Sequence, residues 1–328
     1  MTSPKGLKLV ERDADGVNPA FRADVLAGLG ETQKAIPARW FYDDAGSQLF
    51  EDITQLPEYY PTRAETQILR ARADEFAQLI GPGRAVVEFG SGSSVKTPLL
   101  LSAIAPSAYV PLDIAGDFLR AAAADLSAKF PGLPVHPVEA DFMRRVELPH
   151  EVEGLPKLGF FPGSTIGNMV ARTATDLLRS MRETLGVGAL LLIGMDLIKD
   201  ENVLVAAYDD AAGITARFNL NLLHRINREL DGDIPVNAFA HEARWNDTYA
   251  RIEMHLVAQR DMTFSVSGQR FTMSGGDTIH TENSHKFTRR TANVLLAAGG
   301  WEPRARWTDS EERFSLLLAE ARPPRSAP

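Results

Sequence analysis

Residues 87–97 read Val87-Glu-Phe-Gly-Ser-Gly-Ser-Ser-Val-Lys-Thr97 and join a short apolar run to a helical pattern. Gly90 and Gly92 allow the backbone to pass close to a ligand, because a Cβ at either position would collide with it. The stretch predicts the first strand-to-helix turn of a nucleotide-binding α/β domain. A dinucleotide site or a plain tight turn would also fit, so the turn alone leaves its ligand open.

Short apolar runs alternate with helical patterns from about residue 65 to residue 197. Strands of this length, separated by helices, predict a parallel sheet with helices on both faces. The expected strands are 85–89, 108–114, 135–140, 157–161 and 189–197. A later run, Phe314-Ser-Leu-Leu-Leu-Ala319, could return to the sheet. The predicted fold class is therefore α/β, with a doubly wound, Rossmann-like domain.

Two stretches interrupt this alternation and predict a second, smaller α+β lobe. Residues 19–62 have helical periodicity, and residues 200–285 begin helical before turning to strand-like alternation. We therefore expect a nucleotide-type domain from 63–199 plus 286–328 and a second lobe from 19–62 plus 200–285. The polar residues 1–18 are expected to form a loose N-terminal tail. A junction between two lobes is a common place for a ligand cleft.

The composition favours a small-molecule partner. The chain has a formal net charge of -8 and no long Lys/Arg block, whereas a nucleic-acid partner usually requires a basic face. We therefore expect no nucleic acid. Because the start does not look like a signal peptide and no apolar run is long enough to span a membrane, we expect a cytoplasmic monomer without membrane association.

Cysteine is absent, which removes disulfides, thiolate nucleophiles and thiolate metal ligands together. The seven histidines show no spacing typical of a metal site. We therefore predict no metal, and any nucleophile must be the substrate or another side chain.

Polar residues follow three neighbouring expected strands. Asp113 ends the second strand, where a carboxylate could accept hydrogen bonds from both ribose hydroxyls of a nucleoside. Asp141 and Phe142 follow the third strand, where they could contact an adenine base. Each has an ordinary structural explanation as a helix cap or a core residue. Their occurrence at the ends of consecutive strands, together with Gly90, favours a nucleoside site.

Five longer strings carry a more specific signal. They are Arg39-Trp-Phe-Tyr-Asp-Asp-Ala-Gly-Ser-Gln-Leu-Phe50, Leu56-Pro-Glu-Tyr-Tyr-Pro-Thr62, Gly163-Ser-Thr-Ile-Gly-Asn168, Ala207-Tyr-Asp-Asp-Ala-Ala-Gly213 and Thr281-Glu-Asn-Ser-His-Lys-Phe287. With these strings, the sequence resembles the histidine-specific Nα-methyltransferases of ergothioneine biosynthesis and their fungal relatives acting on other amino acids. The resemblance extends from about residue 20 to residue 320.

The resemblance implies a class I methyltransferase domain that uses S-adenosyl-L-methionine as methyl donor, and a second lobe that closes over a free amino acid. The positions that it assigns to the donor are Gly90, Gly92, Lys96, Asp113, Asp141, Phe142 and Ser164. The positions that it assigns to the substrate are Tyr59, Asn168, Tyr208, Met254, Glu282 and Ser284. Tyr42 and Phe50 are expected as the catalytic aromatic pair beside the reacting amine.

These residue types suit free histidine. Asn168 and Tyr208 supply neutral donors for a carboxylate, and Glu282, assisted by Ser284 and Tyr59, could accept from the imidazole N–H directly or through water. The resemblance, together with the aromatic pair Tyr42 and Phe50, implies three successive transfers that yield Nα,Nα,Nα-trimethylhistidine, which is hercynine.

The aromatic faces of Tyr42 and Phe50 tolerate both a neutral amine and a trimethylammonium, the latter through cation–π attraction. No residue stands out as the base. Relay through Tyr42 and direct release of the proton to water are equal candidates.

Several alternatives remain open. Met254 could contact the substrate ring or simply pack in a strand. His255 occupies a position where the family more often has an aromatic residue, and Asn283 and His285 lie where family members vary. A relative acting on another amino acid such as tryptophan is the nearest alternative. An NAD-dependent oxidoreductase and a non-catalytic scaffold are the others.

Overall fold

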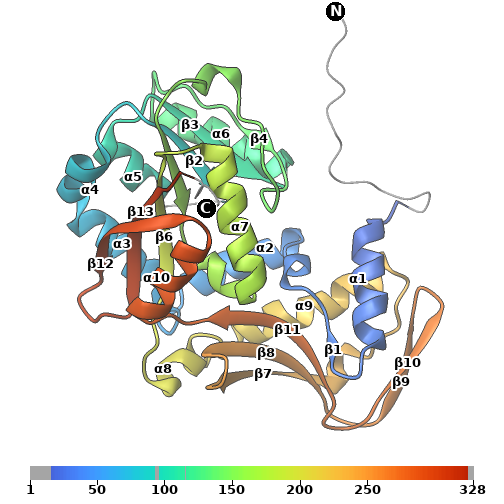
Figure 1. The fold of residues 1–328 in the computed structure, drawn as a ribbon. Helices are drawn as coiled ribbons and strands as arrows, with labels where there is room; N and C mark the ends of the chain where they lie inside the picture. The colour runs from blue at the N-terminus through green and yellow to red at the C-terminus, as the bar shows by residue number, and fades with distance from the viewer. Residues whose placement is uncertain (1–15, 93–95, 115, 324–328) are drawn as a thin grey trace, which may run out of the picture. The chain divides into compact units, whose positions relative to one another are not determined.

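The computed structural model describes residues 16–92, 96–114 and 116–323, and the chain divides into two compact units (Figure 1). One consists of the chain up to Tyr60 and Lys199–His285, and we call it the four-stranded unit. The other consists of Pro61–Ile198 and the chain from Lys286 on, and we call it the seven-stranded unit. Most of the predicted N-terminal tail (residues 1–15) and part of the glycine-rich stretch (residues 93–95) lie outside the described residues.

The seven-stranded unit contains a mostly parallel sheet in the order β12-β13-β6-β5-β2-β3-β4. Its strands are β2 (Ala85–Phe89), β3 (Ala108–Asp113), β4 (Val138–Glu139), β5 (Lys157–Phe161), β6 (Leu190–Asp196), β12 (Trp301–Thr308) and β13 (Phe314–Ala321). The predicted α/β fold class is confirmed. The final apolar run does return to the sheet, as β13, and it pairs antiparallel with both β6 and β12.

Two strands differ from the sequence prediction for local reasons. The expected strand 135–140 is reduced to the two residues of β4 plus an isolated bridge at Val135, because Pro137 has no N–H to donate to a ladder. Strand β12 was not predicted. It lies at the edge of the sheet, is partly exposed along most of its length and contains Pro303, so it lacks a buried apolar run.

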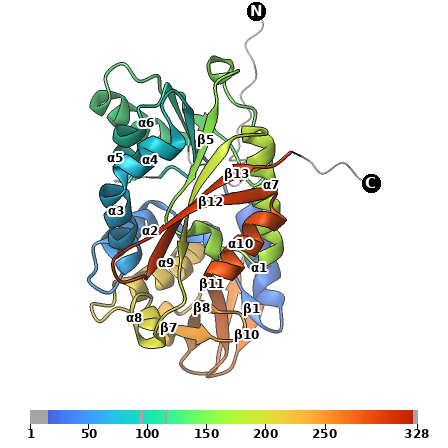
Figure 2. The ribbon, with the colours of Figure 1, turned by 60° about the vertical axis from the view of Figure 1, so that its left-hand side comes forward.

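Helices cover both faces of this sheet. They are α3 (Tyr60–Ala71), α4 (Ala73–Ile80), α5 (Thr97–Ile104), α6 (Gly116–Lys129), α7 (Ala171–Leu185) and α10 (Arg289–Ala298). Figure 2 shows α3, α4, α5 and α6 on one side of the strands, with α7 and α10 on the other. Two short 3₁₀ helices, His150–Val152 (η2) and Thr165–Asn168 (η3), precede and follow β5.

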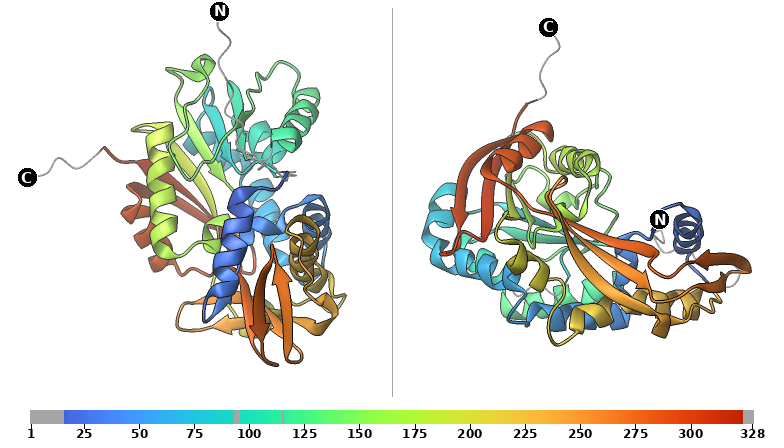
Figure 3. Two further views of the ribbon diagram at one scale, coloured as in Figure 1. Left: turned by 90° about the vertical axis from the view of Figure 1, so that its right-hand side faces the viewer. Right: turned by 90° about the horizontal axis from the view of Figure 1, so that it is seen from below.

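The four-stranded unit has a sheet in the order β1-β11-β8-β7 and a separate β9–β10 hairpin. Its strands are β1 (Lys34–Ala35), β7 (Phe239–Asn246), β8 (Arg251–Ala258), β9 (Met262–Val266), β10 (Gln269–Met273) and β11 (Thr278–His285). Its helices are α1 (Pro19–Gly30), η1 (Ala38–Phe41), α2 (Asp44–Thr54), α8 (Glu201–Ala206), α9 (Ile214–Glu229) and η4 (Val236–Ala238). Helix α9 packs along β7 and β8, and α1 packs against β1 and β10 (Figure 3). The helical segment expected at the start of residues 200–285 is thus interrupted between α8 and α9.

A bulge divides strand β11 into two parts. His280 pairs with His255 of β8 and Glu282 pairs with Met254, so Thr281 is the extra residue. Because side chains alternate along a strand, the bulge places His280 and Glu282 on opposite faces of the sheet although they are two positions apart. The Thr281 hydroxyl donates to Asn219 Oδ1 at 2.8 Å or to the Met254 carbonyl at 3.0 Å, which anchors the bulge.

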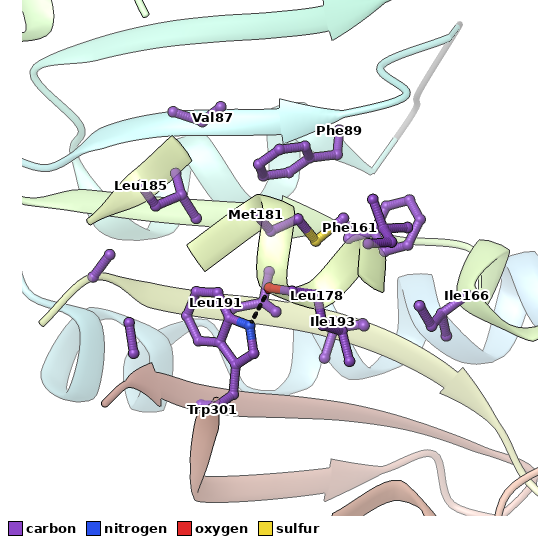
Figure 4. Packing of buried hydrophobic residues seen from close by; sticks show 14 of the residues in the cluster. Val87, Phe89, Phe161, Ile166, Leu178, Met181, Leu185, Leu191, Ile193 and Trp301 are labelled. Carbon is purple, nitrogen blue, oxygen red and sulfur yellow. Dashed lines mark hydrogen bonds between the residues drawn. The ribbon is translucent and has the colours of Figure 1, made fainter. Parts of the chain in front are cut away.

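Each unit has its own hydrophobic core. In the seven-stranded unit, Leu191 and Ile193 of β6 pack toward α7, whereas the alternating Leu190 and Leu192 pack toward the other face. Figure 4 shows the first of these clusters, in which the Trp301 indole N–H donates to the Leu178 carbonyl at 2.8 Å. None of the helices in the described part of the chain has the length and hydrophobicity to span a bilayer.

Candidate active site

The glycine-rich turn after β2 brings four of the predicted donor residues together. Gly90 and Gly92 have positive φ angles of 74° and 22°, which favour glycine. The Gly90 N–H donates to the Leu112 carbonyl at 2.9 Å, and the Gly92 N–H points to the Asp113 carboxylate at 3.4 Å. A Cβ on Gly90 would lie 3.5 Å from the Phe142 ring, so these residues line one short stretch of surface.

A buried carboxylate of helix α3 links a further predicted donor residue, Lys96, to the turn that contains Ser164. Glu65 of α3 is fully buried, and its Oε2 lies 2.6 Å from Lys96 Nζ. The same oxygen accepts a hydrogen bond of 2.9 Å from the Gly163 N–H. Next to it, Ser164 has a left-handed φ of 58°, and its hydroxyl accepts from the Asp196 N–H at 2.9 Å. The sequence analysis missed Glu65, because a single acidic residue in a helix carries no motif.

A second buried carboxylate, also missed, lies beneath the glycine-rich turn. Glu88 of β2 is fully buried, and its Oε2 accepts from the Thr97 hydroxyl at 2.7 Å and the Tyr109 hydroxyl at 2.5 Å. Its other oxygen, Oε1, has no hydrogen-bond partner. Burial raises the pKa of Glu88 to about 7, because removal from water disfavours the charged form.

Asp141 and Phe142 also have ordinary structural roles. The Asp141 carboxylate accepts from the Met143 N–H at 3.0 Å, as in a tight turn. The half-buried Phe142 ring lies edge-on to Phe89 and Phe161, with centroids 6.1 and 6.2 Å apart. Contact of either residue with a base stays a prediction.

In the four-stranded unit, the predicted aromatic residues form one continuous series of rings. Tyr42 and Phe50 have centroids 5.7 Å apart, Phe50 and Tyr59 6.3 Å, and Tyr59 and Tyr208 6.2 Å. All three contacts are edge-to-face, the arrangement that aromatic quadrupoles favour. Phe218 of α9, which the sequence analysis missed, contacts both Tyr42 and Phe50 at 5.8 and 6.1 Å.

Polar groups border this series of rings. The Tyr208 hydroxyl and the Ser284 hydroxyl are 2.7 Å apart and share a hydrogen bond. Tyr42 is 44% exposed as a whole residue. The pKa of its hydroxyl is nevertheless raised well above the usual 10, mainly because neighbouring side chains shield the hydroxyl from water and secondly because of the negative charge of Glu282. Tyr42 is therefore a neutral phenol at physiological pH.

The remaining predicted substrate residues have different surroundings. Met254 is only 1% exposed and belongs to the hydrophobic core of the four-stranded unit, which is its ordinary packing role. Asn168 ends η3 and therefore belongs to the seven-stranded unit, unlike the other five substrate positions. Which of these side chains contact substrate stays a prediction.

Comparison with known proteins gives one consistent result. The family model described as histidine-specific methyltransferase, SAM-dependent, matches residues 21–321. The histidine N-alpha-methyltransferase of Mycolicibacterium smegmatis is 42% identical over 313 residues, which cover 93% of this chain and 96% of that protein. The protein of the same name from Mycobacterium tuberculosis is 42% identical with the same two coverages. Ergothioneine biosynthesis protein 1 of Neurospora crassa is 30% identical over 88% of this chain and 33% of its own length.

Proposed function

The chain belongs to the histidine-specific, S-adenosylmethionine-dependent methyltransferases, and on this basis we propose that it methylates the α-amino group of free L-histidine. Three successive transfers would yield hercynine, a step in ergothioneine biosynthesis. The relatives named for histidine methylation and for ergothioneine biosynthesis support this substrate. Family membership removes the support for an NAD-dependent oxidoreductase. The presence of Tyr59, Asn168, Tyr208 and Glu282 argues against a non-catalytic scaffold.

The seven-stranded unit is proposed to hold S-adenosylmethionine, which supplies an electrophilic methyl group on a sulfonium. Asp113 offers a carboxylate for ribose hydroxyls beside the open backbone of Gly90 and Gly92. Lys96 offers a cation for the carboxylate of the donor, while Glu65 restrains its position. The juxtaposition of Gly92, Asp113 and Phe142 around one turn supports this assignment.

The four-stranded unit is proposed to hold histidine. Glu282 accepts from the imidazole N–H, and Tyr208 with Ser284 forms a hydroxyl pair that can bind substrate oxygen or nitrogen. Tyr42 and Phe50 flank the amine, and their faces stabilise the trimethylammonium product by cation–π attraction. The observation that carries the proposal is the continuous series of rings from Tyr42 to Tyr208 bordered by these polar groups.

Orientation is the main source of rate in this proposal. Alignment of the amine lone pair with the methyl carbon and sulfur is worth up to ~7–11 kcal/mol in favourable cases. The amine must lose its proton first, and exclusion of water favours that loss. The raised pKa of Tyr42 disfavours a phenolate base, so either a relay through the neutral phenol or direct release to water removes the proton.

We also propose that the transfer itself needs no metal ion, because the sulfonium is already an activated leaving group. The net charge of -8 supports the absence of a nucleic-acid partner. A cytoplasmic monomer completes the proposal, and size-exclusion chromatography with light scattering tests the oligomeric state.

Incubation with S-adenosylmethionine and each of the twenty amino acids, followed by mass spectrometry, tests the substrate. We expect mono-, di- and trimethylated products from histidine alone. Preferential methylation of tryptophan would replace histidine with the nearest alternative, and no product from any amino acid would overturn the proposal.

A further inference from the structure

A cluster of potential metal ligands lies on the face of the four-stranded sheet opposite Glu282. Glu253 and His255 are two positions apart on β8 and so share a face, and His280 of β11 pairs directly with His255. One potential ligand atom from each of the three residues lies within 4.8 Å of the other two. The bulge at Thr281 separates this cluster from the proposed substrate residues of the same strand.

The Glu253 carboxylate is oriented by its neighbours. Arg251 Nε and Asn246 Nδ2 both donate to Oε1, at 2.7 and 2.9 Å. The second oxygen, Oε2, lies 3.2 Å from His255 Nε2. A carboxylate oxygen has more than one lone pair, so Oε2 can accept from His255 and still bind a metal ion.

His255 has an unmet hydrogen-bonding requirement. It is only 5% exposed, and its Nδ1 has no hydrogen-bond partner. A proton on Nε2 satisfies the contact with Glu253 but leaves Nδ1 as a buried lone pair, which is costly. A metal ion would supply the missing partner.

His280 presents a lone pair as well. Its Nε2 lies 3.0 Å from the Glu282 carbonyl oxygen, which can only accept, so Nε2 carries the proton and Nδ1 is the basic nitrogen. A histidine whose second nitrogen donates to a backbone carbonyl is the usual form of a metal-binding histidine.

We propose that Glu253, His255 and His280 form a site for a divalent transition-metal ion of the zinc class. Two imidazoles and one carboxylate suit zinc, with a water molecule as fourth ligand. The His255 and His280 rings now stack at 4.7 Å with an interplanar angle of 18°. Since a bound ion lies in the plane of each ring, one ring rotates out of this stack on binding. The bound ion links β8 to β11.

Metal titration of the full chain, with any histidine tag removed, tests this proposal. After treatment with a chelator, the protein competes with a chromophoric indicator for Zn²⁺, and Co²⁺ reports tetrahedral coordination by its visible absorption. We expect one ion per chain and a rise in the unfolding temperature with Zn²⁺. His255→Gln and His280→Gln should each weaken binding by at least about tenfold and abolish the thermal shift.

The control is His224→Gln, which removes an exposed histidine from α9 and should leave Zn²⁺ affinity unchanged. Circular dichroism and S-adenosylhomocysteine binding establish that each variant is folded. Where either histidine variant fails to fold, Glu253→Gln takes its place with the same expected loss. Absence of stoichiometric Zn²⁺ binding, or equal affinity in the wild type and the cluster variants, would overturn the proposal. Neither result depends on methyl transfer.

Discussion

Glu282 is the residue on which the choice of substrate depends most. As a carboxylate it can accept from an imidazole N–H, and a hydrogen bond to a charged group contributes about 1.5–3 kcal/mol. We therefore expect Glu282→Ala to lower kcat/KM for histidine by roughly 10- to 150-fold, the same energy expressed as a rate ratio. Steady-state kinetics measure kcat/KM for histidine. Calorimetric titration with S-adenosylhomocysteine measures whether the donor site still binds its ligand.

The matched control is Glu31→Ala, at an exposed glutamate of the same unit, which should leave kcat/KM unchanged. Binding of S-adenosylhomocysteine should be intact in both variants. If Glu282→Ala turns over histidine at the normal rate, Glu282 does not belong to the substrate site.

Glu88 makes stability depend on pH in an identifiable direction. Its pKa is about 7 in the folded protein against an ordinary 4.5, so the folded state binds the proton more tightly. The resulting stabilisation is fully present below pH 4.5 and is lost as pH rises through 7. About 1.36 kcal/mol per pKa unit makes this an effect of roughly 3 kcal/mol at most.

Urea unfolding of the wild type and Glu88→Gln at pH 5 and pH 8 measures this effect. We subtract the unfolding free energy of Glu88→Gln from that of the wild type at each pH. This difference should be larger at pH 5 than at pH 8. Glu147→Gln, at an exposed glutamate, should show the same difference from the wild type at both values. The assignment fails if the Glu88→Gln difference is also independent of pH.

The sequence predicts those site residues that belong to a local pattern, but it does not predict those whose role depends on contacts with distant segments. Tyr208 and Glu282 lie in strings whose residue order is itself specific, and Asp113 ends an expected strand. Glu65 and Phe218 act through contacts with elements distant in sequence. No local pattern reports such contacts.

Helix α3 is tied to two loops by the Glu65 carboxylate, and this contact gives a prediction at the scale of elements. Glu65→Gln leaves Lys96 without its buried ion-pair partner, and breaking a buried pair costs about 3–5 kcal/mol. We expect that loss in urea unfolding, together with weaker S-adenosylhomocysteine binding because Lys96 is no longer restrained.

The double variant Glu65→Gln/Lys96→Met separates the two effects. It removes the uncompensated charge and should recover part of the stability, but it should not recover ligand affinity. Recovery of both would show that Glu65 is only a structural residue and that Lys96 does not bind the donor.

The predicted strands agree best with the structure where both faces are buried. Strands β2, β5 and β6 are mostly apolar and almost entirely buried, with helices on both sides, so their sequences indicate strands clearly. Strand β12 lies at an edge and β1 has only two residues, so neither has a burial pattern to detect. The Glu253–His255–His280 cluster escaped prediction because it forms across two strands, with a bulge that sets the side on which His280 lies.

At the scale of the whole molecule, ligand binding should distinguish the donor directly. A ligand that binds only the folded state stabilises it by about 2.7 kcal/mol at a hundredfold excess over its Kd. We expect S-adenosylhomocysteine to raise the unfolding temperature accordingly and NAD to leave it unchanged. Asp113→Ala should reduce the shift because it removes the proposed ribose acceptor. A shift with NAD and none with S-adenosylhomocysteine would contradict the donor assignment.

The bulge in β11 also has a consequence for how the length of this strand can change during evolution. Because Thr281 is the extra residue, its deletion would leave His280 opposite His255 and Glu282 opposite Met254, so Glu282 and Ser284 would keep their face of the sheet. The loss of one residue at a regularly paired position of β11 would instead turn the residues beyond it to the other face. A change of one residue in length at the bulge therefore preserves the proposed specificity groups, whereas the same change elsewhere in the strand would remove them from the site.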